Sequence, residues 1–353
     1  MAQNKAIVVA KAGDARILDV PYPTLPGDDY MIVKTTAVAI NPTDWKHVNF
    51  ASQLGNENTR VGCDYAGVVQ EVGPAVTQYK PGDRVCGFIN GCNKFRDTDG
   101  AYATYAASKA PVQGRVPKGW SDEQAATLGV SITTVVRSRA VPNTRPPTPR
   151  RADPGQDPLL IYGGTTATGI YGIQFAKLSG YTVITTGSPK NHELLKSLGA
   201  DHVFDYRSPT LVQDIRAAAG DNLSYAWDCH ADQASANVCA RALNQDGAHY
   251  AGLLGGIDRA VKAANPKAKV SVSLGYTSFG EDAWLGALYP ASQADFDFAK
   301  KFWPLAIDLL DEGKVKPIAI DVNRGGSGLE GVLVGLKELA AGKVSAQKLV
   351  YTL

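Results

Sequence analysis

The residues with the clearest capacity for chemistry lie between positions 163 and 169, in the sequence GGTTATG. The apolar residues before them, 159–162, predict a buried parallel strand, and the apolar spacing after them predicts a helix over residues 170–178. A glycine-rich turn between a strand and a helix N-terminus presents backbone amides to an anion and lets the anion approach closely. The sequence therefore predicts a dinucleotide pyrophosphate site formed by Gly163, Gly164, Thr165, Thr166, Ala167 and Thr168.

This turn departs from the usual G-x-G-x-x-G pattern at its middle position, where Thr166 replaces a glycine. Glycine turns also begin many helices that bind nothing, so the turn alone leaves both interpretations open. The residues that follow favour nucleotide binding, because short β-rich runs alternate with helical segments such as 192–198. The runs cover residues 181–186, 202–204, 225–227 and 248–252. This alternation predicts a doubly wound parallel sheet, the fold in which such turns bind dinucleotides.

The end of the second strand indicates which dinucleotide is bound. An NAD site usually has an acidic residue there, but this chain has the sequence GSPKN at 187–191 and no carboxylate until Glu193. The hydroxyl of Ser188 and the ammonium of Lys190 suit a 2′-phosphate, so the sequence favours NADPH over NADH. The alternative is that Lys190 is an ordinary solvated lysine in a turn.

Length and composition set limits on the function. A chain of 353 residues is long enough for two domains, and a net charge of +2 argues against a nucleic-acid surface. No apolar run is long enough to cross a bilayer, and the amino terminus does not resemble a signal peptide. Five scattered cysteines without a pairing pattern fit a reducing compartment, so we expect a cytoplasmic protein.

The amino-terminal part of the chain consists mostly of short strands broken by glycine and proline. We expect strands at 6–10, 30–40, 66–72, 83–88 and 101–106, which together predict a partly open β-barrel. Four phrases lie within this region: INPTDWK, VGCDYAGVVQEVG, YKPGDRV and GAYATYA. In this order, ahead of a dinucleotide fold, they resemble the medium-chain dehydrogenase/reductase superfamily, in its quinone-oxidoreductase-like branch, over essentially the whole chain.

The resemblance implies an α/β protein with a GroES-like, partly open β-barrel for the substrate and a Rossmann doubly wound parallel sheet for the cofactor. We expect the GroES-like catalytic domain at 1–127, completed by 286–353. The NADPH-binding Rossmann domain is expected at 128–285, with a proline-rich insertion at 141–158.

Zinc-dependent members of this superfamily carry metal ligands at the positions of Asn41, Cys63 and Asp64. Asparagine and cysteine replace the first two ligands here, and only Cys86 and Cys92 lie where a structural zinc lobe would need four cysteines. We therefore expect no metal. Without a metal, reduction of an activated alkene is more natural than oxidation of an alcohol.

A closer resemblance comes from the phrases GGTTAT, SPKN, VFDYR and AHY, together with the proline-rich insertion. These features resemble the fungal trans-acting enoyl reductases of polyketide biosynthesis. The resemblance implies an NADPH-dependent enzyme that reduces the C=C bond of an α,β-unsaturated polyketide acyl thioester. The acyl group would be tethered to the carrier domain of a polyketide synthase in secondary metabolism. The resemblance also implies a monomer, although a dimer is possible.

The resemblance further implies which residues form the site. The implied cofactor contacts, besides the glycine turn, are Thr43, Asp44, Trp45, Lys46, Ser188, Pro189, Lys190, Asn191, Tyr206, Gly252, Leu253, Ser345 and Ala346. The implied substrate contacts are Thr134, Val135, Val136, Arg137, Gly275, Tyr276, Thr277, Ser278 and Phe279. Of these residues, Lys46 and Thr134 are the implied catalytic side chains.

Three questions stay open at the level of sequence. No residue stands out as the proton donor, because Pro42 occupies the position where mitochondrial-type enoyl reductases have a tyrosine. The arginines at 137, 139, 145, 150 and 151 either meet an acidic carrier protein or are solvated surface. The alternative functions are a reductase of free quinones or alkenals and a nucleotide-binding regulator that retains the fold without activity.

Overall fold

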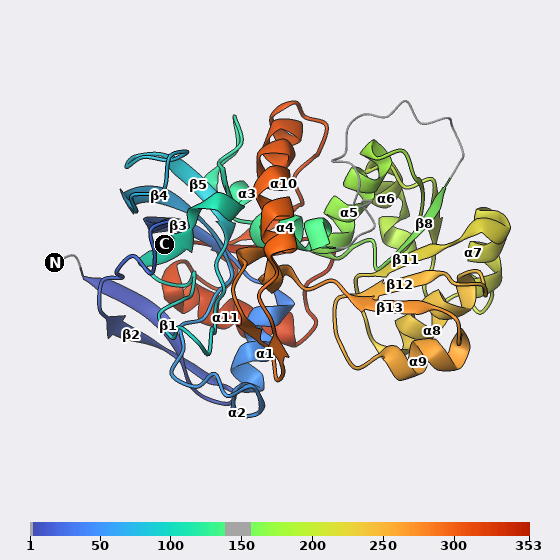
Figure 1. Ribbon diagram of the computed structural model, residues 1–353, viewed down its shortest axis with the longest axis horizontal. Helices are drawn as coiled ribbons and strands as arrows, with labels where there is room; N and C mark the ends of the chain where they lie inside the picture. Colours follow the sequence, from blue (N-terminus) through green and yellow to red (C-terminus); the bar gives the residue numbers. More distant parts are fainter. Residues whose placement is uncertain (1–2, 138–156) are drawn as a thin grey trace. The chain divides into compact units, whose positions relative to one another are not determined.

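The computed structural model describes residues 3–137 and 157–353, and these residues divide into two compact units. The β-rich unit consists of Met1–Thr133 with Tyr276–Leu353, and the parallel-sheet unit consists of Thr134–Gly275. The chain therefore leaves the β-rich unit once and returns to it (Figure 1). The expected insertion at 141–158 lies almost entirely outside the described residues.

The β-rich unit is built on a seven-stranded sheet in the order β16-β17-β3-β4-β5-β7, with β6 paired to β3. Its strands are β3 (Tyr30–Ala39), β4 (Asp64–Val72), β5 (Arg84–Phe88), β6 (Tyr105–Lys109), β7 (Gln113–Arg115), β16 (Ile320–Val322) and β17 (Lys348–Thr352). Two hairpins accompany it: β1 (Asn4–Lys11) with β2 (Asp14–Val20), and β14 (Ala283–Trp284) with β15 (Leu288–Tyr289). The sheet does not close into a barrel, which agrees with the expected partly open arrangement.

Helices cover this sheet and carry part of the predicted site. They are α1 (Pro42–Asn49), α2 (Ala51–Leu54), α3 (Asp122–Ala125), α10 (Gln293–Asp311), α11 (Gly328–Ala340) and the beginning of α4 (Gly129–Arg137). A large core cluster of the unit contains Ile7, Val33, Tyr65 and Tyr351, all fully buried. Helices α1 and α11 pack against each other beside it.

One expected strand of this unit is wrong. Residues 101–106 were expected to form a strand, but β6 begins only at Tyr105. The preceding residues make one isolated bridge, Ala6 with Ala103, and the ring of Tyr102 turns into the core against Gly62. The Tyr102 hydroxyl donates to the buried carboxylate of Asp44 at 2.7 Å. This segment is therefore held by a side-chain hydrogen bond and not by pairing as a strand.

The parallel-sheet unit has the doubly wound architecture expected from the sequence. Six parallel strands follow the order β10-β9-β8-β11-β12-β13, so the order reverses direction between β8 and β11. The strands are β8 (Pro158–Tyr162), β9 (Thr182–Thr186), β10 (His202–Phe204), β11 (Tyr225–Asp228), β12 (His249–Gly252) and β13 (Lys269–Val272).

Helices lie on both faces of this sheet (Figure 1). Helices α5 (Ala167–Leu178) and α6 (His192–Ser197) cover one face. The other face carries α7 (Leu211–Ala219), α8 (Gln233–Ala242) and α9 (Asp258–Ala264). Helix α5 approaches the sheet closely, because a side chain at Gly172 would lie 2.4 Å from the ring of Trp227. Such close approach brings the N-terminus of α5 to the carboxyl end of β8, where the expected pyrophosphate site lies.

A buried ion pair links distant parts of the β-rich unit. The Asp64 carboxylate at the start of β4 is fully buried and pairs with the ammonium of Lys348 on β17, which is 3 % exposed. The Lys348 ammonium also donates to the Thr127 carbonyl at 3.2 Å, and Asp64 Oδ1 accepts the backbone amide of Val130 at 2.6 Å. This one carboxylate therefore holds β17 and the beginning of α4 against β4.

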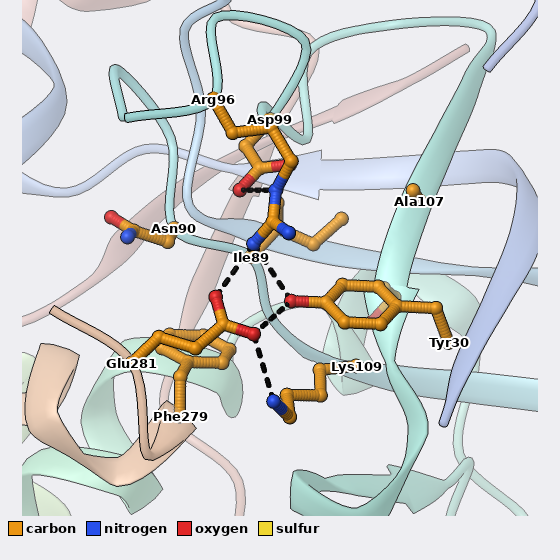
Figure 2. A pocket seen from close by; sticks show the side chains of 10 residues that line it. Tyr30, Ile89, Asn90, Arg96, Asp99, Ala107, Lys109, Phe279 and Glu281 are labelled. Atoms are coloured by element: carbon orange, nitrogen blue, oxygen red, sulfur yellow. Dashed lines mark hydrogen bonds and ion pairs between the residues drawn. The ribbon is translucent and has the colours of Figure 1, made fainter. Parts of the chain in front are cut away.

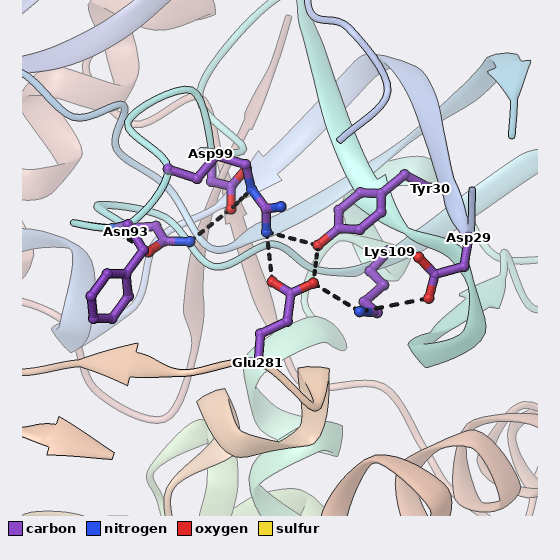
Figure 3. Close-up of polar contacts among 8 residues, drawn as sticks. Asp29, Tyr30, Asn93, Asp99, Lys109 and Glu281 are labelled. Atoms are coloured by element: carbon purple, nitrogen blue, oxygen red, sulfur yellow. Dashed lines mark hydrogen bonds and ion pairs between the residues drawn. The ribbon is translucent and has the colours of Figure 1, made fainter. Parts of the chain in front are cut away.

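A second polar cluster anchors the chain where it re-enters the β-rich unit. Glu281 accepts hydrogen bonds from Tyr30 Oη at 2.6 Å, Arg96 Nη2 at 2.6 Å and Lys109 Nζ at 2.8 Å (Figures 2 and 3). Burial alone would raise the pKa of Glu281, but the bonds from Lys109 and Tyr30 and the charge of Arg96 lower it. We call Tyr30, Arg96, Lys109 and Glu281 the Glu281 cluster. It fixes the segment that follows the 3₁₀ turn Gly275–Phe279.

Replacing Lys348 by methionine is expected to lower the free energy of unfolding by about 3–5 kcal/mol, because the Asp64 carboxylate would stay buried without its cation. Urea titration of the wild-type and variant proteins measures this loss. The double variant Asp64→Leu with Lys348→Met removes both charges and is expected to lose less than the single variant.

The matched control is Lys267→Met, which breaks the exposed ion pair with Asp246. We expect this control to cost under about 1 kcal/mol. A Lys348→Met variant no less stable than Lys267→Met would contradict the role of the buried pair.

Candidate functional site

The glycine turn after β8 has the geometry of a phosphate-binding loop. Gly163 has a φ of +81°, a conformation that favours glycine. A side chain at Gly164 would lie 2.3 Å from the Thr185 hydroxyl, and one at Gly169 would lie 2.4 Å from the Gly163 carbonyl. These three glycines allow α5 to begin directly against the end of β8. The first backbone amides of the helix, from Ala167 onward, have no partner within the helix and can donate to an anion.

Thr166 has a structural role in place of the missing middle glycine. Its φ of −69° requires no glycine, and it is the N-cap of α5. Its hydroxyl accepts the amide of Gly169 at 3.0 Å and donates to the Gly163 carbonyl at 2.9 Å. A threonine at this position therefore closes the turn and begins the helix, as N-cap residues commonly do.

The segment after β9 is the expected 2′-phosphate site. Gly187 is tied to the neighbouring strand by its amide, which donates to the Phe204 carbonyl at 3.0 Å, and Ser188 Oγ accepts from Asn191 Nδ2 at 3.1 Å. Pro189 and Lys190 lie in a short 3₁₀ turn and are both exposed. The ammonium of Lys190 is thus open to solvent, and hydrogen bonds hold the backbone of the segment that carries it.

The end of the neighbouring strand, β10, is followed by an acidic residue, Asp205. The Asp205 carboxylate, just after β10, accepts both the amide and the guanidinium of Arg207 at 3.1 Å. Tyr206 is 47 % exposed, with the Arg207 guanidinium 5.5 Å from its ring centre. Because Arg207 neutralises Asp205, this acid does not repel an anion beside it.

These observations fit a dinucleotide with an additional phosphate. The cradle at Gly164 and Gly169 excludes side chains, α5 offers free amides, and Lys190 offers an exposed cation. Gly252 is buried at the end of β12, and Leu253 follows it, half-buried. The residues present at these strand ends therefore fit a nicotinamide dinucleotide.

The motif at 41–46 forms the first turns of α1 in the β-rich unit. Asp44 is 1 % exposed, and its Oδ2 accepts the amide of Asn41 and the hydroxyl of Tyr102, both at 2.7 Å. Burial raises the pKa of Asp44 to about 6, although both hydrogen bonds act against this rise. The Asp44 side chain therefore caps α1 and faces the core.

The neighbours of Asp44 on α1 are more accessible. Thr43, Trp45 and Lys46 are half-buried, and the Lys46 ammonium lies 5.7 Å from the centre of the Trp45 ring. Burial lowers the pKa of Lys46 below its ordinary value. A partly desolvated ammonium of this kind is a stronger hydrogen-bond donor to a carbonyl or hydroxyl oxygen than a fully solvated one.

The 3₁₀ turn Gly275–Phe279 brings a tyrosine to α1. The hydroxyl of Tyr276 lies 2.8 Å from the Thr43 hydroxyl and 3.7 Å from the sulfur of Cys63. Phe88 packs against both Tyr276 and Phe279. Thr277 and Ser278 are buried in the same turn. The structure thus joins Thr43 and Tyr276, which are 233 positions apart in sequence.

Several buried hydroxyls near these segments have no hydrogen-bond partner in the described part of the chain. They belong to Ser131 and Thr133 on α4 and to Ser278 on the 3₁₀ turn. Buried polar atoms normally find partners, so unpaired ones are compatible with a bound ligand or ordered water. This is a property that no local sequence pattern indicated.

The remaining candidates are placed less completely. Thr134 and Val135 are buried in α4, while the side chains of Val136 and Arg137 lie outside the described structure, as do the arginines at 139, 145, 150 and 151. Ser345 is exposed, and Ala346 has a φ of +55° in the turn before β17.

Two hollows lie in the β-rich unit. The first, beside the Glu281 cluster, is about 10 Å³, which is room for about one water molecule (Figure 2). The second is a groove of about 960 Å³, lined by residues of β5, β7 and α10 that include Arg115 and Asp308. None of the predicted site residues lines either hollow within the described range, apart from Phe279 in the first.

A search for metal-binding groups was made over residues 3–137 and 157–353. It found no cluster of three or more histidine, cysteine, aspartate or glutamate side chains able to hold a metal ion. All five cysteines are buried and free. In the same residues, none of the helices is both long and apolar enough to span a membrane.

Comparisons with known proteins agree with this architecture. Residues 27–118 match the family model of the alcohol dehydrogenase GroES-like domain, and residues 167–288 match the model named zinc-binding dehydrogenase. Among solved structures, the CurK enoyl reductase has a TM-score of 0.75 at 17% identity, with 99% of each chain covered. The quinone oxidoreductase from Coxiella burnetii has a TM-score of 0.72 at 23% identity, with 100% of each chain covered.

Curated relatives are more similar in sequence. The trans-enoyl reductase resD of Aspergillus sclerotiorum is 40% identical over 98% of this chain and 99% of the relative. The enoyl reductase component lovC of the lovastatin nonaketide synthase, from Aspergillus terreus, is 36% identical over 94% of this chain and 91% of that relative.

The fold and the matching family models define a medium-chain dehydrogenase/reductase, an oxidoreductase built from a GroES-like part and a doubly wound sheet. Within that superfamily, the chain belongs to the family of fungal trans-enoyl reductases. The resemblance drawn from the sequence phrases is thereby confirmed.

Folding stability is expected to depend on pH through His47 of α1. His47 is 4 % exposed, and burial lowers its pKa from 6.5 to about 4. Between these values the unfolded chain binds a proton that the folded protein does not. His47 therefore contributes stability in full above pH 6.5, and this contribution is lost as the pH falls to 4, up to about 3 kcal/mol.

The measurement compares urea unfolding of the wild-type protein and His47→Gln from pH 7 to pH 4. We expect the difference in unfolding free energy between them to change across this window. Asp44 titrates in the opposite sense but is present in both proteins, so its contribution cancels. A difference that stays constant with pH would contradict the assignment of a buried, neutral His47.

Proposed function

We propose that this protein is a trans-acting enoyl reductase that uses NADPH to reduce an α,β-unsaturated polyketide acyl thioester carried by a polyketide synthase. The family membership supports the reaction class, since the relatives at 40% and 36% identity are both enoyl reductases by name. The observation that carries the cofactor assignment is the capped glycine turn together with an exposed Lys190 and no carboxylate beside it.

The bound cofactor would supply a hydride for the β-carbon of the enoyl group. The part of this chain is to bind the nucleotide, to orient the thioester and to stabilise negative charge on its carbonyl oxygen as the β-carbon is reduced. Lys46 is the half-buried cation among the residues of α1 expected to face the nicotinamide, so we assign it the hydrogen bond to an oxygen of the cofactor ribose or of the thioester. Thr134 is assigned to the nicotinamide carboxamide.

The pyrophosphate is assigned to the turn at 163–168 and the 2′-phosphate to Ser188, Lys190 and Asn191. Tyr206 is exposed just after β10, the strand beside β9, and we propose that its ring contacts the adenosine. Gly252, Leu253, Ser345 and Ala346 complete the proposed cofactor contacts. The turn at 275–279 and residues 134–137 are proposed to contact the acyl chain.

We propose that the acyl substrate arrives on a phosphopantetheine arm of a carrier domain, because the related lovC protein is named as a component of a synthase. A monomer is the proposed oligomeric state. The five free, buried cysteines support a cytoplasmic location, since a reducing compartment keeps thiols unpaired.

The direct test is consumption of NADPH with pantetheine-linked α,β-unsaturated acyl substrates, measured beside simple quinones at equal concentration. We expect turnover of the enoyl thioesters and little or none of the quinones. Lys46→Ala is expected to lower kcat/KM for the thioester by at least about tenfold, because it removes a charged hydrogen bond to a developing negative charge.

The control for this variant is Lys34→Ala on β3, an exposed lysine outside the proposed site. Preferred turnover of quinones would favour the alternative of a quinone oxidoreductase. Tight NADPH binding without oxidation by any of these substrates would favour a regulator that retains the fold.

Cofactor preference is expected to depend on Lys190. Lys190→Ala should weaken NADPH binding by about tenfold and leave NADH binding nearly unchanged, because only NADPH carries the 2′-phosphate. Fluorescence titration with each nucleotide measures both dissociation constants. The matched control is Lys196→Ala. Lys196 is an exposed lysine on α6, outside the turn that carries Lys190, and it pairs with Glu193. An equal loss for both nucleotides would show that Lys190 does not read the 2′-phosphate.

A further inference from the structure

A surface of the β-rich unit combines apolar side chains with a lysine around Trp284 of β14. Trp284 is half-buried, and its ring nitrogen donates to the carbonyl of Leu54 in α2 at 2.7 Å. Leu288 of β15 lies directly opposite Trp284, so both side chains lie on one face of the hairpin, and Leu288 is 52 % exposed. The ammonium of Lys94 lies 4.0 Å from the centre of the Trp284 ring.

A series of contacts connects this surface to α1. The amide of Leu54 donates to the carbonyl of Phe50 at 2.9 Å, and the rings of Phe50 and Trp45 lie 6.5 Å apart, centre to centre. Phe50 is 47 % exposed, and the Lys46 ammonium lies 5.7 Å from the centre of the Trp45 ring. The series of contacts therefore begins at Lys94 and ends at Lys46. We call Phe50, Leu54, Lys94, Trp284 and Leu288 the Trp284 surface.

The two lysines of this series are held by tryptophan rings, and neither has an ion-pair partner among residues 3–137 and 157–353. The other cations that lie over aromatic rings in this part of the chain each form an ion pair: Arg96, Lys109, Arg207 and Lys300. A cation–π contact orients an ammonium group without neutralising its charge. The exposed ammonium of Lys94 is therefore available to an anion from outside the protein.

Acidic groups on the neighbouring segments do not compensate Lys94. The Glu57 carboxylate, after α2, accepts the Ser52 hydroxyl at 2.9 Å, and the Asp282 carboxylate, before β14, accepts a backbone amide at 2.8 Å. The Asp99 carboxylate, on the same loop as Lys94, pairs with a guanidinium at 2.9 Å. An anion that reaches Lys94 thus does not have to displace a carboxylate of this chain.

A ligand of this surface must combine a negative charge with apolar groups. Exposed apolar side chains that lie together on adjoining elements favour apolar contacts, and an uncompensated ammonium favours a phosphate or carboxylate. A phosphopantetheine arm carries a phosphate, then a carbon with two methyl groups, then two amides and the thioester. This order matches a surface that begins with a cation, continues with exposed apolar side chains and ends at the lysine assigned to the thioester.

We propose that the Trp284 surface binds the phosphopantetheine arm of the carrier domain. Lys94 binds the phosphate, Trp284 and Leu288 contact the dimethyl group, and Phe50 lies along the arm toward Lys46. The inference rests on the proposed function, because the thioester end of the arm is located by the assignment of Lys46.

The test compares two substrates that differ by one phosphate: an enoyl thioester of phosphopantetheine and the same enoyl thioester of pantetheine. Lys94→Ala is expected to lower the ratio of kcat/KM for the phosphorylated over the unphosphorylated substrate by about tenfold, because it removes a charged hydrogen bond to the phosphate. Lys94→Arg keeps the cation and is expected to hold the ratio within about threefold of the wild type. Leu288→Ser is expected to raise KM for both substrates by about threefold, since its apolar contact does not involve the phosphate.

Lys80→Ala is the matched control, since Lys80 is an exposed lysine of the same unit in the segment before β5. This variant is expected to keep the wild-type ratio. An equal loss for the two substrates in Lys94→Ala would overturn the proposal. The dissociation constant of NADPH is measured for every variant. If Lys94→Ala changes this constant as much as it changes the ratio, the lysine binds a cofactor phosphate and the proposal is wrong.

The remaining occupant to exclude is a second copy of this chain. Sedimentation equilibrium measures the oligomeric state of the wild type and of Leu288→Asp. A wild-type dimer that Leu288→Asp dissociates would overturn the proposal, because the partner copy would then cover the surface. A monomer in both cases leaves the surface open to the arm, as we expect.

The inference and the proposed function fail separately. An active enzyme whose Lys94→Ala variant keeps the wild-type ratio would overturn the inference and leave the proposed function standing. A wild-type protein that reduces neither thioester would contradict the proposed reaction. Isothermal titration calorimetry with the saturated acyl thioesters of phosphopantetheine and pantetheine then decides the role of Lys94, and equal affinities for the two ligands would overturn it.

Discussion

The buried carboxylate of Asp64 is the constraint on which the β-rich unit depends. A carboxylate removed from water costs several kcal/mol unless a cation and hydrogen-bond donors replace the lost solvent. Here the cation comes from Lys348 and a donor from the backbone amide of Val130. These groups are separated by 284 and 66 positions from Asp64, so the charge is compensated only when the ends of the chain have met. The carboxyl-terminal strand is thus part of the folding unit and not an addition to it.

This constraint reaches the proposed site through strand pairing. Lys348 begins β17, which pairs with β3, and the amide of Ile40 at the end of β3 donates to the Leu349 carbonyl at 3.0 Å. Helix α1 begins two residues after Ile40, and it carries Thr43 in its first turn and Lys46 in its last turn. On the other side of Asp64, Cys63 precedes β4 and contacts Tyr276. The same buried pair therefore fixes both the helix and the thiol to which the turn at 275–279 is bonded.

The features that the sequence predicts correctly are those with a local periodic pattern. The strand at 202–204 and the alternation of strands and helices around it match the structure, because a buried parallel strand and a glycine turn are recognisable over a few residues. The segment at 101–106 was mistaken for a strand, since the inward turn of Tyr102 depends on Asp44, 58 positions away. The contacts of Tyr276 with Thr43 and of Glu281 with Tyr30 span 233 and 251 positions. No local pattern records such pairs, so these contacts became visible only in three dimensions.

The substituted glycine turn shows how a sequence motif can change while its backbone geometry is retained. A glycine is needed where φ is positive or where a side chain would collide with its neighbours. Gly163 has a positive φ, and a side chain at Gly164 or Gly169 would collide with its neighbours. Neither holds for the backbone of Thr166, which has an ordinary extended conformation. Its hydroxyl makes two hydrogen bonds within the turn, to the Gly163 carbonyl and from the Gly169 amide. The threonine therefore stabilises a loop that a middle glycine would leave more mobile. The amides that we propose to bind phosphate belong to the backbone, and the substitution preserves the backbone.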